Sequence, residues 1–537
     1  MDRKILIVGI DSGSWEVLDT FIERGCMPNL KKLRDHGVSG ILQSTVPALT
    51  PPAWTTLMTG VHPGKHQVIS FEKYDCAANR LGFSTSHSIA FETMWTYLSR
   101  QGIKVASLNM PQTYPPLEVN GVMVSGYGCP GTHTEFAYPG ELKQKILENI
   151  PDYDFTFGWQ GEKDMHDDNA LDAAMINSKK CFENDARLFR LINEEYPWRL
   201  MLIQIHQLDR LLHRIWRYIT PAYLDQHPKQ GEKILDLFSC LDGSIEQMTG
   251  RVQGADDLIM FVSDHGHGPA FASVLPNVLL KNWGYLKSHR TSKNLSQRLK
   301  KNLGKWLKIK PAKSTKESMN LVDKLQLDWP ATRAVVVHSH QMACLYLNVK
   351  GRQEGGVVNP GAEYVRLLEE LQGRFLAVRD PRNNQPIFSQ VITPQKLYGV
   401  SDETAVKFGD LLLIPVDGFS VRRSLRRDNF IDYFDDGLRG MHYSEGMFLI
   451  HGAQVKTHTR FDADIADIVP TIYAALNVPL PDNLDGKVLQ EAFVTPLEIK
   501  TASITPDQKP PPRGPGKPLT DQEEQSIQNK LIDLGYL

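Results

Sequence analysis

The chain has 537 residues, with 60 Lys and Arg against 62 Asp and Glu, so its formal net charge is −2, and 41% of its residues are hydrophobic. Near neutrality argues against general nucleic-acid binding, and no apolar run approaches the roughly 18 residues that a membrane span needs. The six cysteines are scattered without a CxxC pair, which disfavours a disulfide framework and a zinc ribbon. We expect reduced, mostly buried thiols in a cytoplasmic protein without a signal peptide, because the first apolar run is short and Asp11 interrupts it. Nothing in the composition indicates an oligomeric state.

Short β-branched runs recur along the chain between helical patterns. Their length suits strands buried on both faces, as in a parallel sheet covered by helices. The clearest strands are expected at residues 4–9, 104–109, 122–127, 199–206, 257–263 and 446–452. Apolar residues from 234 to 248 repeat at helical spacing. The pattern predicts an α/β fold with a layered, mostly parallel central sheet flanked by helices, and with inserted cap segments.

Two stretches are expected to be cap-like insertions in this core, at residues 128–175 and 285–330. Within the second, residues 288–316 are rich in Lys and Arg and contain no Asp or Glu, and they place leucines and a tryptophan on one helical face. A basic amphipathic helix suits peripheral contact with an anionic membrane or an acidic partner. It equally suits a solvated lid helix packed on the protein, so both interpretations stay open.

The C-terminal region reads as a Pro-rich linker at residues 491–519 and a short helix at residues 520–537. Thr520 and Glu523 form a capping-box pattern at the start of that helix. We expect the helix to dock back on the domain.

Polar residues cluster where the predicted strands end, and ligands of open α/β sheets bind at the carboxyl ends of strands. One Asp follows the first strand in the sequence GIDSG, an Asp-His pair ends another in SDHG, and an Asp and a His lie four residues apart on a predicted helix. Singly, most of these residues are explained by turns, caps or core packing. Together they form a mixed nitrogen and oxygen ligand set for two zinc-like ions. The candidates are Asp11, Asp209, His213, Asp264, His265 and His442.

The hydroxyl of Thr50 is the remaining candidate for the metal site. Pro51 and Pro52 suit the first turn of a helix and Gly60 suits its end, which places Thr50 at the N-cap. A Thr there usually only caps the helix, but it also points at the positive helix end, where a phosphate binds. Three further histidines near these motifs are expected to support the ligands or to pack in the core. They are His66, His206 and His267.

These motifs resemble those of the alkaline phosphatase superfamily, and within it the type I phosphodiesterase/nucleotide pyrophosphatase-like branch. The resemblance runs from Lys4 to about Leu489, so we expect residues 1–490 to form the catalytic domain. It implies two divalent metal ions, Zn²⁺ or else Mn²⁺. It assigns Asp11, Thr50, Asp264 and His265 to one ion, and Asp209, His213 and His442 to the other.

The chain also departs from related patterns. Thr50 and Trp54 replace the Cys and Arg of the sulfatase motif C/S-x-P-x-R, which disfavours sulfatase activity. Nucleotide pyrophosphatases place a phosphate-binding asparagine downstream of the nucleophile, whereas residues 68–71 here read VISF. Lys65 is the candidate substitute for binding the substrate. The late DIVPT and DG elements, at residues 467–471 and 485–486, look structural.

The resemblance implies a metal-dependent hydrolase of phosphate esters, a phosphodiesterase or phosphomonoesterase, that works through a phosphothreonine intermediate at Thr50. Its expected partner is a small phosphate ester, and the residues do not distinguish monoester, diester, nucleotide, lipid headgroup and phosphonate. One alternative is a phosphomutase or phosphotransferase of the same superfamily. Another is a membrane-surface protein that uses residues 288–316 for binding and hydrolyses esters only incidentally.

Overall fold

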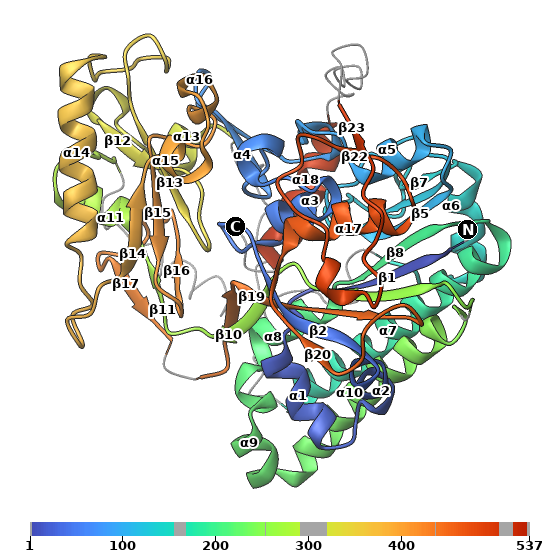
Figure 1. Cartoon of the computed structure of the whole chain (residues 1–537). Coiled ribbons are helices and arrows are strands. Elements are labelled where there is room, and N and C mark those ends of the chain that lie inside the picture. Colours follow the sequence, from blue (N-terminus) through green and yellow to red (C-terminus); the bar gives the residue numbers. More distant parts are fainter. Residues whose placement is uncertain are drawn as a thin grey trace. The chain divides into compact units, whose positions relative to one another are not determined.

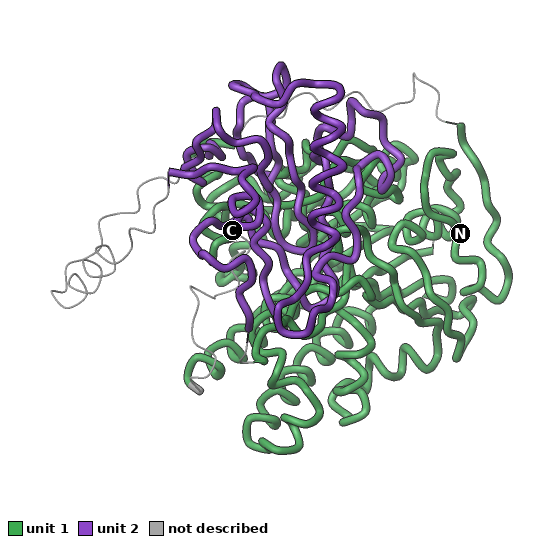
Figure 2. The backbone as a smooth tube through the Cα atoms, turned by 90° about the vertical axis from the view of Figure 1, so that its left-hand side faces the viewer, with its two compact units in different colours: residues 1–71, 84–271, 435–537 green, residues 72–83, 272–434 purple. Residues whose placement is uncertain are grey.

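The computed structural model describes residues 3–154, 168–252, 254–289, 319–434, 437–503 and 519–533. They belong to two compact units, which Figure 2 colours separately. Unit 1 combines residues 1–71, 84–271 and 435–537, and unit 2 combines residues 72–83 and 272–434. Most of the basic segment 288–316 and of the linker 491–519 lies outside the described residues.

Unit 1 is built on one large sheet (Figure 1). In spatial order its strands are β20 (Thr459–Arg460), β2 (Gly37–Gln43), β19 (Glu445–His451), β9 (Leu258–Val262), β1 (Ile5–Ile10), β8 (Leu200–Ile205), β5 (Val105–Met110), β6 (Gly121–Ser125) and β7 (Ala137–Tyr138), and β21 (Ala463–Asp464) pairs with β2. The strands from β9 to β6 pair in parallel, so the predicted α/β fold class is confirmed.

Strand β19 differs from the expected parallel arrangement, because it runs antiparallel to both β9 and β2. Its apolar run gave no sign of this, since a strand buried on both faces reads the same in either direction. The reversal brings the beginning of β19 to the edge of the sheet where β1, β8 and β9 end. Strand β18 (Gly440–Tyr443), which comes just before β19 in the chain, is therefore delivered to that edge.

Helices cover both faces of this sheet through alternate residues of its strands. Leu6 and Val8 of β1 face one core, and Ile5 and Ile7 face the other. The first core receives α1 (Trp15–Glu23), α2 (Pro28–Asp35), α6 (Glu141–Asn149), α7 (Asp168–Glu195), α8 (Gln207–Ile215) and α10 (Pro228–Thr249). The second receives α3 (Thr50–Thr59), α5 (Met94–Arg100) and α17 (Ile468–Ala475). The expected helix at 234–248 thus lies within α10.

Unit 2 has sheets of its own. Its four-stranded antiparallel sheet has the order β12 (Ala334–Val336), β13 (Ala343–Leu347), β15 (Leu411–Pro415) and β14 (Phe388–Ile392). A second sheet pairs β11 (Ala272–Val274) with β16 (Phe419–Val421) and β17 (Ile431–Tyr433). The hairpin of β3 (Glu72–Asp75) and β4 (Arg80–Phe83) joins this unit, and the buried guanidinium of Arg423 donates to the Glu72 carboxylate. The described parts of the expected insertion 285–330 lie here.

The C-terminal helix α18 (Asp521–Asp533) docks on unit 1, as its pattern predicts. Ile527 and Leu531 are buried, and Lys530 Nζ donates to the carbonyl of Cys129 at 2.9 Å. All six cysteines are free, but only Cys129 and Cys344 are buried, so the expectation of mostly buried thiols was wrong. Within the described residues, the search found no helix with the length and hydropathy to cross a membrane.

Gly9 in β1 makes room for Trp54 of α3, the helix that carries Thr50. A Cβ at Gly9 would lie 2.5 Å from the Trp54 ring, whereas a Cβ at Gly243 in α10 would meet nothing within 4 Å. We expect Gly9→Ala to lower the free energy of unfolding by about 1–3 kcal/mol through overpacking. Gly243→Ala, the matched control, should raise it by up to about 1 kcal/mol. Urea denaturation measures both, and equal stability of the two variants would contradict this account of the packing.

Candidate active site

The sheet edge formed by the ends of β1, β8 and β9 gathers the predicted site residues, all of them in unit 1. One Asp follows β1, an Asp and a His lie on α8 after β8, and an Asp-His pair follows β9. Strand β18 supplies the last His, and the hydroxyl comes from the start of α3. All seven side chains except that of His213 are nearly or fully buried. The residues are Asp11, Thr50, Asp209, His213, Asp264, His265 and His442.

The sequence pattern places Thr50 at the N-cap of α3, but in the structure Thr50 is the first residue of the helix itself. Leu49 has extended dihedral angles and its carbonyl accepts the first helical hydrogen bond, from Ala53 N at 3.0 Å, so Leu49 is the N-cap. The helix ends as predicted at Gly60, whose φ of 70° suits glycine. Thr50 Oγ1 thus lies at the positive end of the helix dipole.

The first group of side chains surrounds this hydroxyl. His265 Nε2 lies 3.4 Å from Thr50 Oγ1, 3.1 Å from Asp264 Oδ2 and 3.8 Å from Asp11 Oδ1. His265 Nδ1 lies 3.1 Å from the carbonyl oxygen of Gly266, which assigns the ring hydrogen to Nδ1 and leaves the Nε2 lone pair facing the two carboxylates. Acceptor atoms that face one another in this way require a cation or a proton between them.

Asp11 is held by two residues at the end of β8. Gln204 Nε2 donates to Asp11 Oδ2 at 2.8 Å, and His206 Nδ1 lies 2.8 Å from the same oxygen. The His206 ring is stacked on Tyr127 at a centroid distance of 4.3 Å. These contacts orient the other oxygen, Asp11 Oδ1, toward His265. The support role expected of His206 agrees with this geometry.

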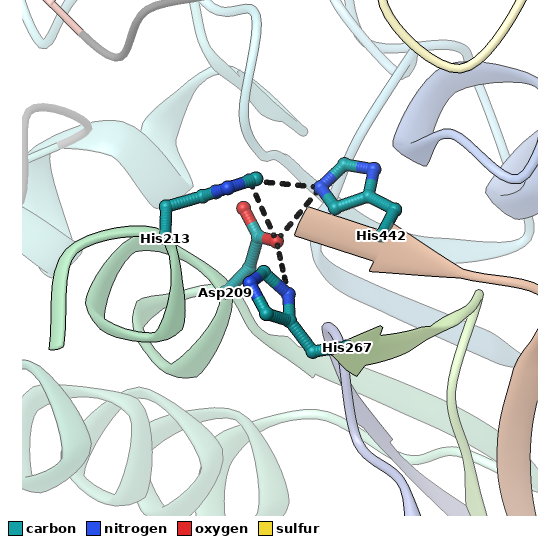
Figure 3. Close-up of side chains that lie close together, drawn as sticks. All are labelled: Asp209, His213, His267 and His442. Carbon is teal, nitrogen blue, oxygen red and sulfur yellow. Dashed lines mark hydrogen bonds and ion pairs between the residues drawn. The ribbon is translucent and has the colours of Figure 1, made fainter. Parts of the chain in front are cut away.

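The second group lies beside the first, and Figure 3 shows its side chains pointing toward one another. His442 Nε2 lies 3.0 Å from Asp209 Oδ1 and 2.9 Å from His213 Nε2, and His213 Nε2 lies 3.3 Å from Asp209 Oδ1. His213 Nδ1 lies 3.0 Å from the carbonyl of Gly440, so its Nε2 is free of the ring hydrogen and faces the group.

The structure adds His267 to this second group. Its Nδ1 lies 3.8 Å from Asp209 Oδ1, and the ligand atoms of Asp209, His213, His267 and His442 all lie within 4.8 Å of one another. From the sequence, His267 was expected only to support the ligands or to pack in the core. Its position two residues after His265 was the available signal, because alternate residues of a strand share a face.

Ser12, which the sequence analysis passed over, connects the two groups. Its Oγ donates to Asp209 Oδ1 at 2.6 Å, and its backbone N–H donates to Asp264 Oδ1 at 3.2 Å. Its φ of 62° lies in the left-handed region, which a serine adopts only at a cost. Asp209 also lies close to both groups, since its carboxylate comes within 4.8 Å of Asp11 and His265 ligand atoms.

Three buried carboxylates so close together oppose one another's ionisation. Burial, and then the charges of Asp264 and Asp209, raise the pKa of Asp11 well above its ordinary value. Burial acts in the same direction on Asp209, but His213 and His442 outweigh it and hold its pKa well below the usual range. Burial lowers the pKa of His267 and His442, which keeps both rings in the neutral form that binds metals.

The chemistry of both groups fits divalent cations. Asp11 Oδ1 and Asp264 Oδ2 are buried and accept no hydrogen bond from the described residues. A cation among carboxylate oxygens and imidazole nitrogens satisfies such atoms and relieves their repulsion. The two sets therefore have the donor types and spacing of metal sites.

The remaining candidates have other contacts. His66 Nδ1 accepts from Val68 N at 3.1 Å and its Nε2 lies 2.9 Å from Thr56 Oγ1, which is a core role. Lys65 Nζ is paired with Asp485 Oδ1 at 2.5 Å, so its contact with substrate stays a prediction that this pairing disfavours. The DG element at residues 485–486 contacts the C-terminal end of α3, because Asp485 N donates to the carbonyl of Gly60 at 3.0 Å.

One protein family and several solved structures are similar to this chain. The model of the type I phosphodiesterase/nucleotide pyrophosphatase family matches residues 5–442. The chain belongs to this family. It is therefore a hydrolase that acts on phosphoester or phosphonate bonds. A search of curated proteins found no match.

Solved structures share the fold at low sequence identity. Phosphonoacetate hydrolase from Sinorhizobium meliloti 1021, in complex with phosphonoformate, is 14% identical with a TM-score of 0.55, over 89% of this chain and 96% of that one. Murine ectonucleotide pyrophosphatase/phosphodiesterase 5, an inactive variant in complex with AMP, is 13% identical with a TM-score of 0.54, over 90% and 97%. The human protein of the same name is 12% identical with a TM-score of 0.55, over 92% and 100%.

The raised pKa of Asp11 predicts a pH-dependent instability in metal-free protein. Because the folded pKa exceeds the unfolded one, Asp11 contributes stability below about pH 4 that is lost as the pH rises through the folded value. In chelator, Asp11→Asn should therefore gain stability over the wild type as the pH rises, by up to about 1.4 kcal/mol per pH unit between the two pKa values. Urea denaturation from pH 4 to 8 measures the difference, and a pH-independent difference would refute it.

Proposed function

We propose that the protein cleaves small phosphate esters in two steps through a phosphothreonine at Thr50, with two divalent cations bound by the two groups of side chains. Asp11, Thr50, Asp264 and His265 would hold one cation. Asp209, His213 and His442 would hold the other. Bound there, the cations would lower the pKa of the hydroxyl and of water and would neutralise phosphate oxygens and the leaving oxygen.

The observation that carries this proposal is the placement of Thr50. Its Oγ1 lies at the positive end of α3 and 3.4 Å from His265 Nε2, in the group whose Asp11 Oδ1 and Asp264 Oδ2 have no hydrogen-bond donor among the described residues. A threonine hydroxyl is far too weakly acidic to attack phosphorus at neutral pH by itself. The positive helix end and a cation bound beside it would both stabilise the negatively charged alkoxide form of Thr50, and so make it accessible at neutral pH.

In the first step the Thr50 hydroxyl loses its proton, Oγ1 forms a bond to phosphorus, and the bond from phosphorus to the leaving oxygen breaks, after which the leaving group takes up a proton. In the second step water attacks the phosphothreonine from the opposite side, which restores the Thr50 hydroxyl and releases the phosphate product. The positive end of the α3 dipole favours the phosphate charge during both steps, but backbone donors add little there, because Pro51 and Pro52 have no amide hydrogen and the Ala53 N–H donates to the Leu49 carbonyl. His206 and Gln204 keep Asp11 in its orientation throughout.

Zinc is the metal we propose for both groups, with manganese as the alternative, because the ligands combine imidazole nitrogen with carboxylate oxygen. The substrate class is inferred as a diester or nucleotide-like ester. This inference is supported by the family model and by the solved structure of similar fold, murine ectonucleotide pyrophosphatase/phosphodiesterase 5, that is in complex with AMP. A phosphonate is the second candidate, favoured by the neighbouring phosphonoacetate hydrolase fold. The cytoplasmic location stays a prediction.

A hydrolysis panel tests the substrate class. It compares p-nitrophenyl phosphate, bis-p-nitrophenyl phosphate, p-nitrophenyl thymidine monophosphate and phosphonoacetate, each with several divalent metals. We expect the diesters to turn over fastest. Addition of an alcohol acceptor separates hydrolysis from phosphoryl transfer, because a transferase would yield the phosphorylated alcohol as the main product.

Replacement of the proposed nucleophile gives a direct prediction. Thr50→Ala should lower kcat by at least about a thousand-fold, because it removes the nucleophile, and the nearby Ser12 hydroxyl is engaged as a donor to Asp209. Metal content, measured by elemental analysis, should largely survive. Thr50→Ser, the control that keeps a hydroxyl, should retain measurable activity. Normal turnover by the alanine variant would remove Thr50 from the mechanism.

Removal of metal gives a second prediction. Dialysis against a chelator should abolish activity, and Zn²⁺ or Mn²⁺ should restore it. Rebinding at a hundredfold excess over Kd should also stabilise the fold by about 2.7 kcal/mol for each bound ion, visible as a rise in Tm. Activity that is indifferent to chelation, in protein that contains no metal, would defeat the two-cation proposal.

A further inference from the structure

His267 is a buried histidine to which the proposed reaction gives no role. It lies on β10 (Gly266–Pro269), directly opposite His442 on the antiparallel strand β18. Side chains of directly opposed residues share one face of such a ribbon, and the two ring centroids are 5.8 Å apart. The ribbon therefore presents two imidazoles to the place where α8 presents Asp209 and His213 (Figure 3).

The distances among these four side chains fit a single ion. Four ligand atoms at roughly 2.0–2.1 Å from a tetrahedral zinc ion lie roughly 3.3 Å from one another. The measured separations are 2.9 Å, 3.0 Å and 3.3 Å among Asp209, His213 and His442. His267 Nδ1 lies 3.8 Å from Asp209 Oδ1, which a small ring movement would close.

Only one of the two ring nitrogens of His267 has a hydrogen-bond partner among the described residues. Ser12 Oγ lies 2.6 Å from Asp209 Oδ1, and since an ionised carboxylate only accepts, the single Ser12 hydrogen points there. His267 Nδ1, 3.0 Å from Ser12 Oγ, must then donate to it, which leaves the Nε2 lone pair facing the protein interior. That Nε2 is buried and has no hydrogen-bond partner among the described residues. As a metal ligand through Nδ1, the neutral ring would carry its hydrogen on Nε2 instead.

Gly440 provides the space for this ring. A Cβ there would lie 2.5 Å from His267 Nε2 and 2.6 Å from its Cδ2. The carbonyl oxygen of Leu212 lies 2.5 Å from the same point, so a backbone acceptor stands on the Nε2 side of His267. The carbonyl of Gly440 itself orients His213, whose Nδ1 lies 3.0 Å away. One glycine thus serves two of the four side chains.

We propose that His267, through Nδ1, is a fourth protein ligand of the cation held by Asp209, His213 and His442. This inference rests on the two-cation function proposed above. Zinc sites with four protein ligands are closed, whereas sites with three keep a position open for water or substrate. With His267 the Asp209 group would have four protein ligands, as many as the group around Thr50, and a water or a leaving oxygen would bind there as a fifth ligand.

Two substitutions separate a ligand from a mere hydrogen-bond donor. His267→Asn places an amide N–H near the position of Nδ1, where it can still donate to Ser12 Oγ, but the amide is a poor zinc ligand. His267→Ala removes both functions. His66→Gln is the matched control, because His66 is equally buried, lies outside both groups, and a Gln amide can still reach Thr56 Oγ1.

The readouts are Zn²⁺ affinity, from competition with a chromophoric chelator, and the visible absorption of the Co²⁺-substituted protein. We expect two ions per chain in the wild type and in His66→Gln. Both His267 variants should bind one of the two ions at least about 100-fold more weakly, which exceeds the usual cost of losing only an outer-shell partner, and should lose absorption typical of four-coordinate cobalt. The other ion should stay bound, which also reports that the variants are folded.

Other outcomes overturn the inference. Wild-type affinity in His267→Asn together with a loss in His267→Ala would show that His267 only positions Ser12. Unchanged affinity in both variants would show that it has neither role at the ion, and in each of these cases the two-cation proposal would stand. A wild-type protein that binds no divalent ion would instead defeat the proposed function itself.

Discussion

The repulsion among three buried carboxylates governs the architecture of unit 1. Asp11, Asp209 and Asp264 are completely buried at one edge of the sheet. Ionised carboxylates that have left water need compensating positive charge or strong donors. Around them the chain places imidazoles, a serine hydroxyl and the start of a helix, and these contacts leave Asp11 Oδ1 and Asp264 Oδ2 without a donor among the described residues. The fold holds together a set of charges that two cations would neutralise.

Sheet topology explains why the groups meet. The parallel strands β1, β8 and β9 end at the same edge, so residues that follow them converge even though about 250 positions separate Asp11 from Asp264. The antiparallel strand β19 begins at that edge, which lets the preceding β18 deliver His442 there. The close packing of Trp54 against Gly9 then sets α3, and with it Thr50, against the end of β1.

Family membership sets the reaction class but leaves the substrate to features that vary between members. The solved neighbours share 12–14% identity with this chain over about nine tenths of its length. Cores tolerate such divergence because many apolar combinations fill the same volume, whereas ligand positions tolerate little displacement. In this chain residues 68–71 read VISF, and His267 stands beside the second group.

The sequence by itself determined the class of the sheet, the positions of its central strands within one or two residues, and seven side chains that do meet. Those depend on local patterns: apolar runs, i to i+4 spacing on α8, and the proline and glycine that bound α3. The direction of β19, the extent of unit 2, the contacts of Lys65 and the presence of Ser12 and His267 beside the predicted site residues were decided only by tertiary structure. Strand pairing and cross-strand register bring such residues together, and neither leaves a periodic trace along the chain.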